Sequence, residues 1–333
     1  MYNLTSAKIF ISTNAKLGGP NTFVINLKSF FKNNNKLTFI NDIKKSDYVL
    51  LIGENFLLKD LLLALLLNKK SCIRLDGRRF DFYSSIRFKR EGNDGFYKFL
   101  KSVYFEIKVA IGFLFASKVI YQSKFTRQQW IQLEKLLKKE FSIIINPFYL
   151  NPFEKEIQNQ NNVINIKKKS PKYILASKGF IHDSILLSSA YRIFNSMGIK
   201  MMIFGNVSSS LKRTFPLIEF YGYKDADTYK KYLFNCFAFL CIENNACCPN
   251  SLIEAQSFGK PIIGPNNGSL PEMCPEPSIQ LLNYGKSIDK DLENLTNEYI
   301  ENYGYWVNKT FDFSIMTFGP NQYNKYYEFL VKK

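Results

Sequence analysis

The sequence predicts an α/β protein made of two Rossmann-like domains, each with a parallel sheet. Three observations predict this class. Short apolar runs alternate with amphipathic stretches along most of the chain, as in repeated βα units. A polar and charged stretch at 151–170 separates two such series, as an interdomain linker does. The chain has 333 residues and is 46% hydrophobic, which is enough for two packed cores.

The first series, residues 1–150, reads as five or six βα units. Its expected strands are 7–13, 37–40, 47–53, 71–75, 118–123 and 142–146. Its expected helices are 21–31, 56–67, 96–115 and 124–139. In the last of these, Trp130, Leu133, Leu136 and Leu137 form the apolar face.

A glycine turn joins the first strand to the first helix. The turn contains Gly18, Gly19 and Pro20. A strand, a glycine-rich turn and a helix in this order let backbone N–H groups approach a phosphate. The spacing matches neither the dinucleotide-binding nor the Walker pattern, so the sequence supports neither of those ligands. A tight turn without a ligand is the alternative.

The second series, residues 171–312, begins after the linker. Its expected strands are 172–177, 200–206, 218–223, 237–242 and 261–264. Its expected helices are 183–197, 228–235 and 251–258, and Asp225 or Asp227 is expected to cap the second of them. Beyond Glu272 the pattern is less regular, with helices expected at 299–309 and 321–332.

Residues 236–271 carry the strongest functional signal. A strand, a turn, a helix capped by Asn250 or Ser251 and ended at Gly259, and a second strand form one βαβ unit. Glu254 lies in the first turn of that helix, beside N–H groups that can hold an anion. A carboxylate for hydroxyls next to a helix N-terminus for phosphate suits a nucleotide. The alternative is a plain crossover whose helix dipole favours Glu254.

The run 248–272 resembles the donor-binding segment of retaining GT-B glycosyltransferases of the family 4 type (group 1). The resemblance rests on Pro-Asn-Ser, Ile-Glu-Ala, Gly-Lys-Pro and Gly-Ser-Leu-Pro-Glu in that order. It implies that Glu254 holds the ribose hydroxyls of a nucleotide sugar. The first acid of the family motif falls on Ala246, so this chain departs from the pattern there. Glu243 and Asn244 are the candidates to take its place.

The resemblance also implies a set of site residues. The segment Arg74–Gly77 resembles a family segment at a strand end, where Asp76 is expected to orient an acceptor hydroxyl; a simple turn is the alternative. Tyr223 is expected to line the base pocket, and the amides of Asn250, Ser251 and Leu252 to face the donor. The diphosphate is expected to meet Gly18, Gly19, Lys178 and Arg213. No metal and no cofactor other than the nucleotide-sugar co-substrate is expected.

The implied architecture is GT-B, with two Rossmann-like domains facing each other. The first, 1–150, binds the acceptor and the second, 171–312, binds the nucleotide sugar. A C-terminal helix within 313–333 returns to the first domain. The implied activity is a hexosyltransferase that moves a sugar from a nucleotide-diphosphate sugar to a glycan, lipid or other acceptor, with retention and without metal.

Composition adds weaker constraints. The formal net charge is +17, but the basic residues are scattered, and nucleic-acid motifs are absent, so no nucleic acid is expected as partner. Six cysteines and one histidine match no zinc pattern. Residues 1–30 lack a signal-peptide pattern, which favours the cytoplasm and reduced thiols. Aromatic residues and lysines alternate in 96–115, so this helix is a candidate for peripheral contact with an anionic membrane.

Two alternatives to an active glycosyltransferase follow from the same residues. One keeps the fold and changes the reaction, as a nucleotide-sugar epimerase or an inactive relative, because Ala246 replaces the first acid. The other is a basic protein that binds nucleic acid or a membrane surface. The sequence does not indicate the sugar, the base or the acceptor.

Overall fold

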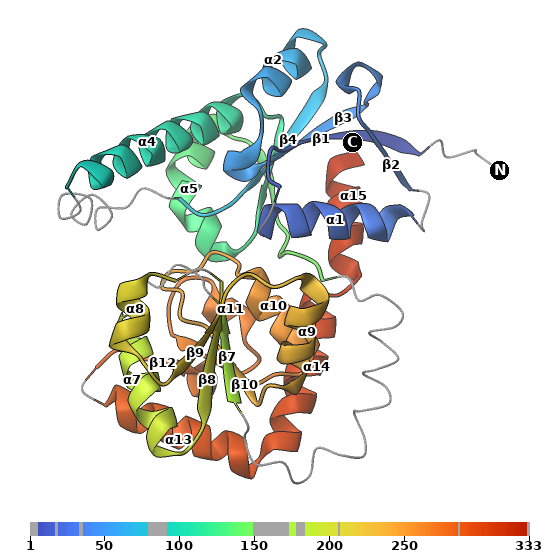
Figure 1. Ribbon diagram of the computed structural model, residues 1–333. Coiled ribbons are helices and arrows are strands. Elements are labelled where there is room, and N and C mark those ends of the chain that lie inside the picture. Colours follow the sequence, from blue (N-terminus) through green and yellow to red (C-terminus); the bar gives the residue numbers. More distant parts are fainter. Residues whose placement is uncertain are drawn as a thin grey trace. The chain divides into compact units, whose positions relative to one another are not determined.

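The computed structural model describes residues 6–16, 19–32, 36–78, 92–148, 173–177, 184–205, 207–285 and 287–331. The chain forms two compact units (Figure 1). Unit 1 comprises Met1–Tyr149 and Pro320–Lys333, and unit 2 comprises Leu150–Gly319. The expected linker 151–170 lies outside the described residues. The C-terminal segment of unit 1 begins at Pro320 and not at the expected 313, because α14 (Tyr303–Phe318) runs on within unit 2.

Unit 1 contains a six-stranded parallel sheet in the order β2-β1-β3-β4-β5-β6. Its strands are β1 (Ala7–Ser12), β2 (Leu37–Ile40), β3 (Tyr48–Ile52), β4 (Lys70–Leu75), β5 (Lys118–Tyr121) and β6 (Glu140–Ile143). Its helices are α1 (Gly19–Lys32), α2 (Leu58–Leu66), α4 (Gly92–Phe115), α5 (Lys124–Leu137) and α15 (Asn321–Val331), with the 3₁₀ turns η1 (Ile43–Lys45) and η2 (Gly53–Asn55).

Strand β3 shows why this sheet is buried on both faces. Its residues Val49, Leu50, Leu51 and Ile52 are all fully buried. Leu50 and Ile52 pack into one hydrophobic cluster, and Val49 and Leu51 pack into another. Because successive side chains of a strand point to opposite faces, each cluster lies on its own side of the sheet. A continuous apolar run is therefore what a central parallel strand requires.

The C-terminal helix α15 completes the first of these clusters. Tyr323, Tyr326 and Leu330 of α15 are buried in it together with residues of α1. Phe30 stacks on Tyr323 with 4.4 Å between the ring centroids. The amino group of Lys118 donates a hydrogen bond to the carbonyl of Phe329 at 2.9 Å. The last helix is thus part of the core of unit 1.

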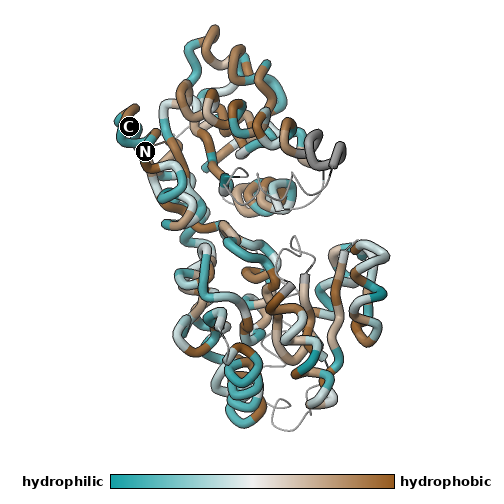
Figure 2. Tube along the Cα trace, turned by 90° about the vertical axis from the view of Figure 1, so that its left-hand side faces the viewer, coloured by the Kyte–Doolittle hydropathy of each residue, from teal (hydrophilic) through white to brown (hydrophobic). Residues whose placement is uncertain are grey.

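Helices α2 and α4 cover the other face of the unit 1 sheet and keep exposed apolar side chains. In Figure 2, α2 at the top of unit 1 is brown over most of its length, and its Leu66 is 83% exposed. Leu100, Tyr104 and Ile107 of α4 are about half exposed. Leu136 of α5, expected on the apolar face, is 77% exposed. No helix of the described residues is both long and apolar enough to cross a membrane.

Unit 2 contains a second six-stranded parallel sheet, in the order β12-β11-β10-β7-β8-β9. Its strands are β7 (Tyr173–Ser177), β8 (Lys200–Phe204), β9 (Ile218–Tyr221), β10 (Ala238–Leu240), β11 (Ile262–Pro265) and β12 (Leu281–Leu282). Its helices are α7 (Ser184–Ser196), α8 (Ser209–Thr214), α9 (Ala226–Asn235), α10 (Asn250–Ser257), α11 (Leu270–Met273), α12 (Pro277–Gln280), α13 (Ile288–Glu301) and α14.

The region after Glu272 is more regular than the sequence analysis expects. Helix α13 runs from Ile288 to Glu301, and α14 starts at Tyr303, so the expected helix 299–309 belongs to two helices. The buried residues Ile288, Leu292, Leu295 and Tyr299 recur at intervals of three and four, the spacing of one helix face. This face packs into the main core of unit 2.

Candidate functional site

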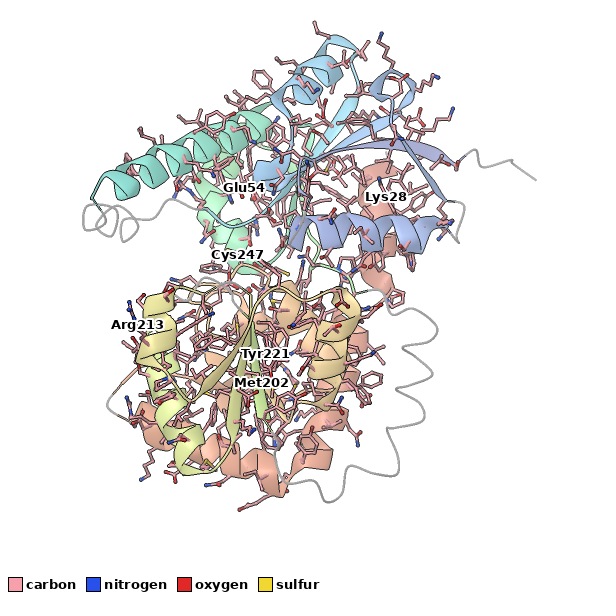
Figure 3. All side chains as sticks on the ribbon, viewed as in Figure 1. Lys28, Glu54, Met202, Arg213, Tyr221 and Cys247 are labelled. Carbon is pink, nitrogen blue, oxygen red and sulfur yellow. The ribbon has the colours of Figure 1, made fainter. Side chains whose placement is uncertain are left out.

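Unit 2 presents the predicted donor residues at the carboxyl edge of its sheet. All strands are parallel, so the loops after β8, β9, β10 and β11 meet at this edge, where open α/β sheets bind ligands. Strand β10 leads through a loop into α10, and β10 pairs with β11, which closes the predicted parallel βαβ unit. Figure 3 labels Cys247 in that loop, at the strand ends of unit 2.

Helix α10 begins without a side-chain cap. Pro249 occupies the N-cap position, so the predicted capping by Asn250 or Ser251 is wrong. Proline has no side-chain acceptor, and Asn250 is already the first helical residue. The N–H of Leu252 donates to the carbonyl of Pro249 at 3.1 Å, and the Leu252 side chain is fully buried. Asn250 and Ser251 are half-buried.

Glu254 lies in the second turn of α10 and not in the predicted first turn, because the helix already begins at Asn250. It is half-buried and acts electrostatically on Tyr229 of α9. Burial raises the pKa of Tyr229 well above its ordinary value, and the negative charge of Glu254 adds to the rise. The Tyr229 hydroxyl is buried and has no hydrogen-bond partner in the structure described. Sequence analysis missed Tyr229, because no local pattern distinguishes it from Tyr232, the other tyrosine of α9.

The position of the missing first acid is enclosed by the turn after β11. Ala246 is 2% exposed, and its carbonyl accepts a hydrogen bond from the Ser269 N–H at 2.7 Å. Gly268 has φ +62°, and a Cβ there would lie 2.6 Å from the Ala246 carbonyl oxygen. The Asn267 amide donates to the side chain of Asn244 at 2.7 Å. Asn244 is thus held in the turn, whereas Glu243 is half-buried with a pKa raised by burial.

Tyr223 and Arg213 lie after neighbouring strands of unit 2. Tyr223 follows β9 and is 70% exposed. Arg213 is exposed in the last turn of α8, where a cation also interacts favourably with the helix dipole. Asp225 caps α9, because its carboxylate accepts the Thr228 N–H at 2.8 Å. This confirms N-capping as the role of the Asp225-Ala-Asp227 sequence.

Unit 1 gathers a polar network at the carboxyl edge of its own sheet. Asp76 follows β4, Gln122 follows β5 and Asn146 follows β6. Buried Arg74 donates to Asp76 Oδ1 at 3.1 Å and to Asn146 Oδ1 at 2.6 Å. Gln122 Nε2 donates to the same oxygen of Asp76, and Asn146 Nδ2 donates to Gln122 Oε1 at 3.0 Å. The network ties three loops together around one guanidinium.

The structure thus places Asp76 in a network whose first role is structural. Its Oδ1 already accepts from Arg74 and Gln122, and the Arg74 guanidinium lies 4.2 Å from the Phe23 ring centroid. The Asp76 side chain is nevertheless 32% exposed. Gly53 has φ +43°, and a Cβ there would lie 2.2 Å from Asp76 Oδ2. Only glycine therefore lets the loop after β3 approach this carboxylate.

The comparisons with known proteins decide the fold. No model of a known protein family matches the chain, and a search of curated proteins finds no match. Among solved structures, HepE from Anabaena in complex with UDP matches with a TM-score of 0.59 at 13% identity, over 96% of this chain and 98% of HepE.

Two further enzymes match over nearly their whole length. Sucrose-phosphate synthase from Thermosynechococcus elongatus has a TM-score of 0.64 at 11% identity, over 96% of this chain and 97% of the synthase. WaaG, a glycosyltransferase of lipopolysaccharide biosynthesis, has a TM-score of 0.62 at 10% identity, over 98% of this chain and 100% of WaaG. The fold is GT-B. At these identities the likeness establishes the architecture of two Rossmann-like units.

Within this GT-B chain, the predicted site residues divide into three groups. Unit 2 holds Glu254, Tyr223, Asn250, Ser251, Leu252 and Arg213, on the loops and helices that follow its parallel strands. Gly19 and Asp76 lie in unit 1; Gly19 is the first residue of α1, whereas the sequence analysis expects it in a turn before the helix. Gly18 and Lys178 lie outside the described residues.

Both units contain cysteines, Cys72 in unit 1 and the other five in unit 2. None of the six cysteines, all of which lie in the described part of the chain, forms a disulfide. Cys72, Cys236, Cys241 and Cys274 are buried. Burial raises the pKa of Cys236 to about 11 and that of Cys241 to about 12, so both are protonated at neutral pH. These thiols act as small apolar side chains of the core.

Proposed function

We propose that the protein is a glycosyltransferase that moves a sugar from a nucleotide-diphosphate sugar to a hydroxyl of an acceptor. The observation that carries the proposal is Glu254, which lies in α10 at the carboxyl edge of the second Rossmann-like unit of a GT-B chain. Structures of the similar protein HepE hold UDP, UDP with glucose, and UDP-glucose. A uridine or guanosine diphosphate sugar is therefore the proposed donor class.

In this proposal Glu254 positions the nucleotide and does not take part in bond making. Its carboxylate accepts hydrogen bonds from the ribose hydroxyls, and the N-terminus of α10 faces phosphate. Tyr223, exposed after β9, lines the base pocket. The Tyr229 hydroxyl, which is buried and unpaired in the structure described, is an added candidate for the ribose side of the site. Positioning of this kind lowers the entropic part of the barrier.

The proposed reaction is a hexosyl transfer with retention, of the family 4 type. Charge builds on the leaving diphosphate, and preorganised donors are the usual means of stabilising it. The chain's own candidates are the amides at Gly18 and Gly19, the amides at Asn250 and Ser251, and the cations of Lys178 and Arg213. The proposal needs no metal, because these donors and cations balance the diphosphate. Asp76 is proposed to orient the acceptor hydroxyl.

We also propose that the exposed face of α4 contacts a membrane surface. Leu100, Tyr104 and Ile107 are spaced by four and three residues and are about half exposed, so they share one face of the helix. Together with the net charge of +17, this face favours peripheral contact with an anionic membrane. The test is cosedimentation of the protein with anionic vesicles, which Ile107→Ser is expected to weaken. Unchanged cosedimentation of this variant would contradict a role for α4.

Nucleotide binding through Glu254 is tested by a thermal-shift panel of UDP, GDP and their sugars. A nucleotide at about one hundred times its Kd stabilises the protein by about 2.7 kcal/mol, which raises the Tm of a domain of this size by roughly 5–10 °C. We expect Glu254→Gln to lose most of this rise, because an amide is a weaker acceptor than a carboxylate. Glu293→Gln, at an exposed position on α13, is the matched control.

The two variants separate binding from folding. Their Tm without nucleotide reports whether unit 2 is intact, and the rise with nucleotide reports the site. Equal rises for Glu254→Gln and Glu293→Gln would show that the carboxylate of Glu254 does not contact the nucleotide.

A further inference from the structure

Two adjacent thiols lie in the loop between β10 and α10, and they are the least buried cysteines of the chain. Cys247 and Cys248 are half-buried, whereas the other four cysteines are buried. Burial raises the pKa of those four thiols above the ordinary value, so they stay protonated at neutral pH. A reagent that attacks thiols therefore meets two neighbouring side chains first.

The backbone on both sides of this pair is held in place. Ala246, immediately before Cys247, is 2% exposed, and its carbonyl accepts the Ser269 N–H at 2.7 Å. Pro249, immediately after Cys248, is buried, and its carbonyl accepts two N–H groups of α10 at 3.1 and 3.3 Å. Because a proline follows it, Cys248 is also restricted to extended backbone conformations. The pair therefore needs little further ordering to bind one atom through both sulfurs.

A direct disulfide between Cys247 and Cys248 would be strained. Adjacent Cα atoms lie about 3.8 Å apart across a trans peptide, whereas disulfides usually join Cα atoms about 4.4–6.8 Å apart. Strain of this kind makes a disulfide easy to reduce. The structure holds both residues as thiols. An atom that bonds to both sulfurs leaves them farther apart than an S–S bond does, so a bridging ligand avoids the strain.

The number of ligands selects the class of bridging atom. Among the described residues, no three His, Cys, Asp or Glu side chains are arranged to hold a metal ion. Structural zinc takes four such ligands, so two thiols do not complete its coordination. Thiolates prefer soft, thiophilic centres. A trivalent arsenic atom that already carries one organic group needs two sulfur ligands, which is the number that this pair supplies.

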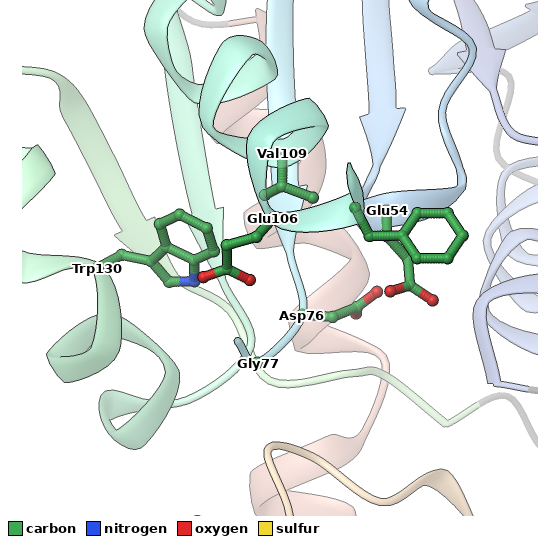
Figure 4. A pocket seen from close by; sticks show the side chains of 7 residues that line it. Glu54, Asp76, Gly77, Glu106, Val109 and Trp130 are labelled. Carbon is green, nitrogen blue, oxygen red and sulfur yellow. The ribbon is translucent and has the colours of Figure 1, made fainter. Parts of the chain in front are cut away.

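Unit 1 offers no second site of this kind. Its one thiol, Cys72, is buried. Unit 1 also contains the cavity shown in Figure 4, which carboxylate and apolar side chains such as Glu54, Glu106 and Trp130 line. No cysteine is among the described residues that line this cavity, and it has room for about one water molecule. One bridging group per chain is therefore expected.

We propose that Cys247 and Cys248 form a dithiol site for trivalent arsenicals that carry one organic group. The oxide R–As=O takes the protons of both thiols, two As–S bonds form, and the oxygen leaves as water. No oxidant or reductant is consumed. One of the two protons is the one that Cys247 donates to the Asn245 carbonyl, with 3.7 Å between sulfur and oxygen.

Uptake of phenylarsine oxide by the reduced, folded chain tests this site. Intact-mass measurement should show one phenylarsenic group per chain. An excess of 2-mercaptoethanol should leave the group bound, whereas 2,3-dimercaptopropanol should remove it, because only a dithiol replaces both As–S bonds at once. No uptake, or equal release by the two reagents, overturns the inference. This release test uses the unaltered chain, so it holds even where a variant folds poorly.

Matched variants locate the uptake. Cys247→Ser and Cys248→Ser should each retain the phenylarsenic group at least about a hundredfold more weakly, because the second bond within one chain raises the overall affinity by about that factor or more. Cys72→Ala, at a buried thiol of unit 1, should retain the group as the unaltered chain does. Full retention by either serine variant would also overturn the inference.

The dithiol site has a consequence for donor binding, and this consequence rests on the proposed function. The two thiols directly precede Pro249 and the N-terminus of α10, where donor phosphate is proposed to bind. A phenylarsenic group there should remove the rise in Tm with UDP or GDP, and Cys247→Ser treated in the same way should keep it. Equal rises in the treated and untreated chains would contradict this consequence. If no nucleotide raises the Tm of the untreated chain, the proposed function fails and the uptake result still stands.

Discussion

Replacing Asp76 by Ala is expected to destabilise unit 1 by about 3–5 kcal/mol, since it leaves a buried guanidinium without its counter-charge. Arg74 is 1% exposed, and its hydrogen bonds go to Asp76 and Asn146. Its Nε already has no hydrogen-bond partner in the structure described. Losing the carboxylate would leave a second nitrogen of the buried guanidinium without its acceptor. Asp76→Asn should cost less, because the side-chain oxygen remains as an acceptor for Arg74 and Gln122.

Urea unfolding followed by Trp130 fluorescence in the Trp306→Phe background measures this loss in unit 1 alone. The control is Glu140→Ala, whose exposed ion pair with Lys118 is expected to contribute at most about 1 kcal/mol. A loss below about 1 kcal/mol for Asp76→Ala would show that Arg74 does not depend on this carboxylate. If Asp76→Asn keeps the stability and loses transfer, the role of Asp76 in orienting the acceptor gains support.

Replacing Gly268 by Ala is expected to cost unit 2 about 3 kcal/mol and to disturb the loop before α10. The residue has φ +62°, which L-amino acids rarely adopt, and its new Cβ would meet the Ala246 oxygen at 2.6 Å and nitrogen at 2.7 Å. These are backbone atoms, so no side-chain rotation relieves the contact, and overpacking of this kind costs roughly 1–3 kcal/mol by itself.

Two other glycines of unit 2 serve as graded controls, followed through Trp306 in a Trp130→Phe background. Gly198 has φ +69° and open space around it, so Gly198→Ala should cost only about 1 kcal/mol. Gly304 lies exposed in α14 with no atom near a new Cβ, and Gly304→Ala should stabilise by up to about 1 kcal/mol. Equal losses of stability in Gly268→Ala and Gly198→Ala would contradict the close contact between Gly268 and the backbone of Ala246.

The sequence was sufficient to predict most strands and the parallel arrangement of the strands within each sheet. Apolar runs such as Tyr48–Ile52 are long enough, and bounded clearly enough, to indicate buried parallel strands. Local chemistry also predicted that Asp225 or Asp227 caps α9, and Asp225 does so. The start of α10 at Asn250 did not follow, because a proline N-cap leaves no side-chain signature. Helix α13 carries a clear helical periodicity that the sequence analysis passed over.

The candidate sites were predictable only in part, since they join residues far apart in the chain. Asp76 stands out because it follows a strand, but its partners Gln122 and Asn146 follow two other strands. Their meeting depends on the strand order β4-β5-β6, which local patterns do not specify. Trp130 was expected as an ordinary core residue of its helix. Only the structure shows that it also lines a pocket beside Glu106.

The central claim, that this GT-B chain transfers sugar from a nucleotide sugar, is tested most directly by measuring nucleotide diphosphate release. The purified chain is incubated with UDP- and GDP-sugars, with and without neutral methyl glycosides offered as acceptors. The account predicts slow release with water alone for at least one donor, faster release with the glycoside, and a large loss of both in Glu254→Gln. A folded chain that releases nucleotide diphosphate from none of these donors, and is stabilised by none of them, would contradict it.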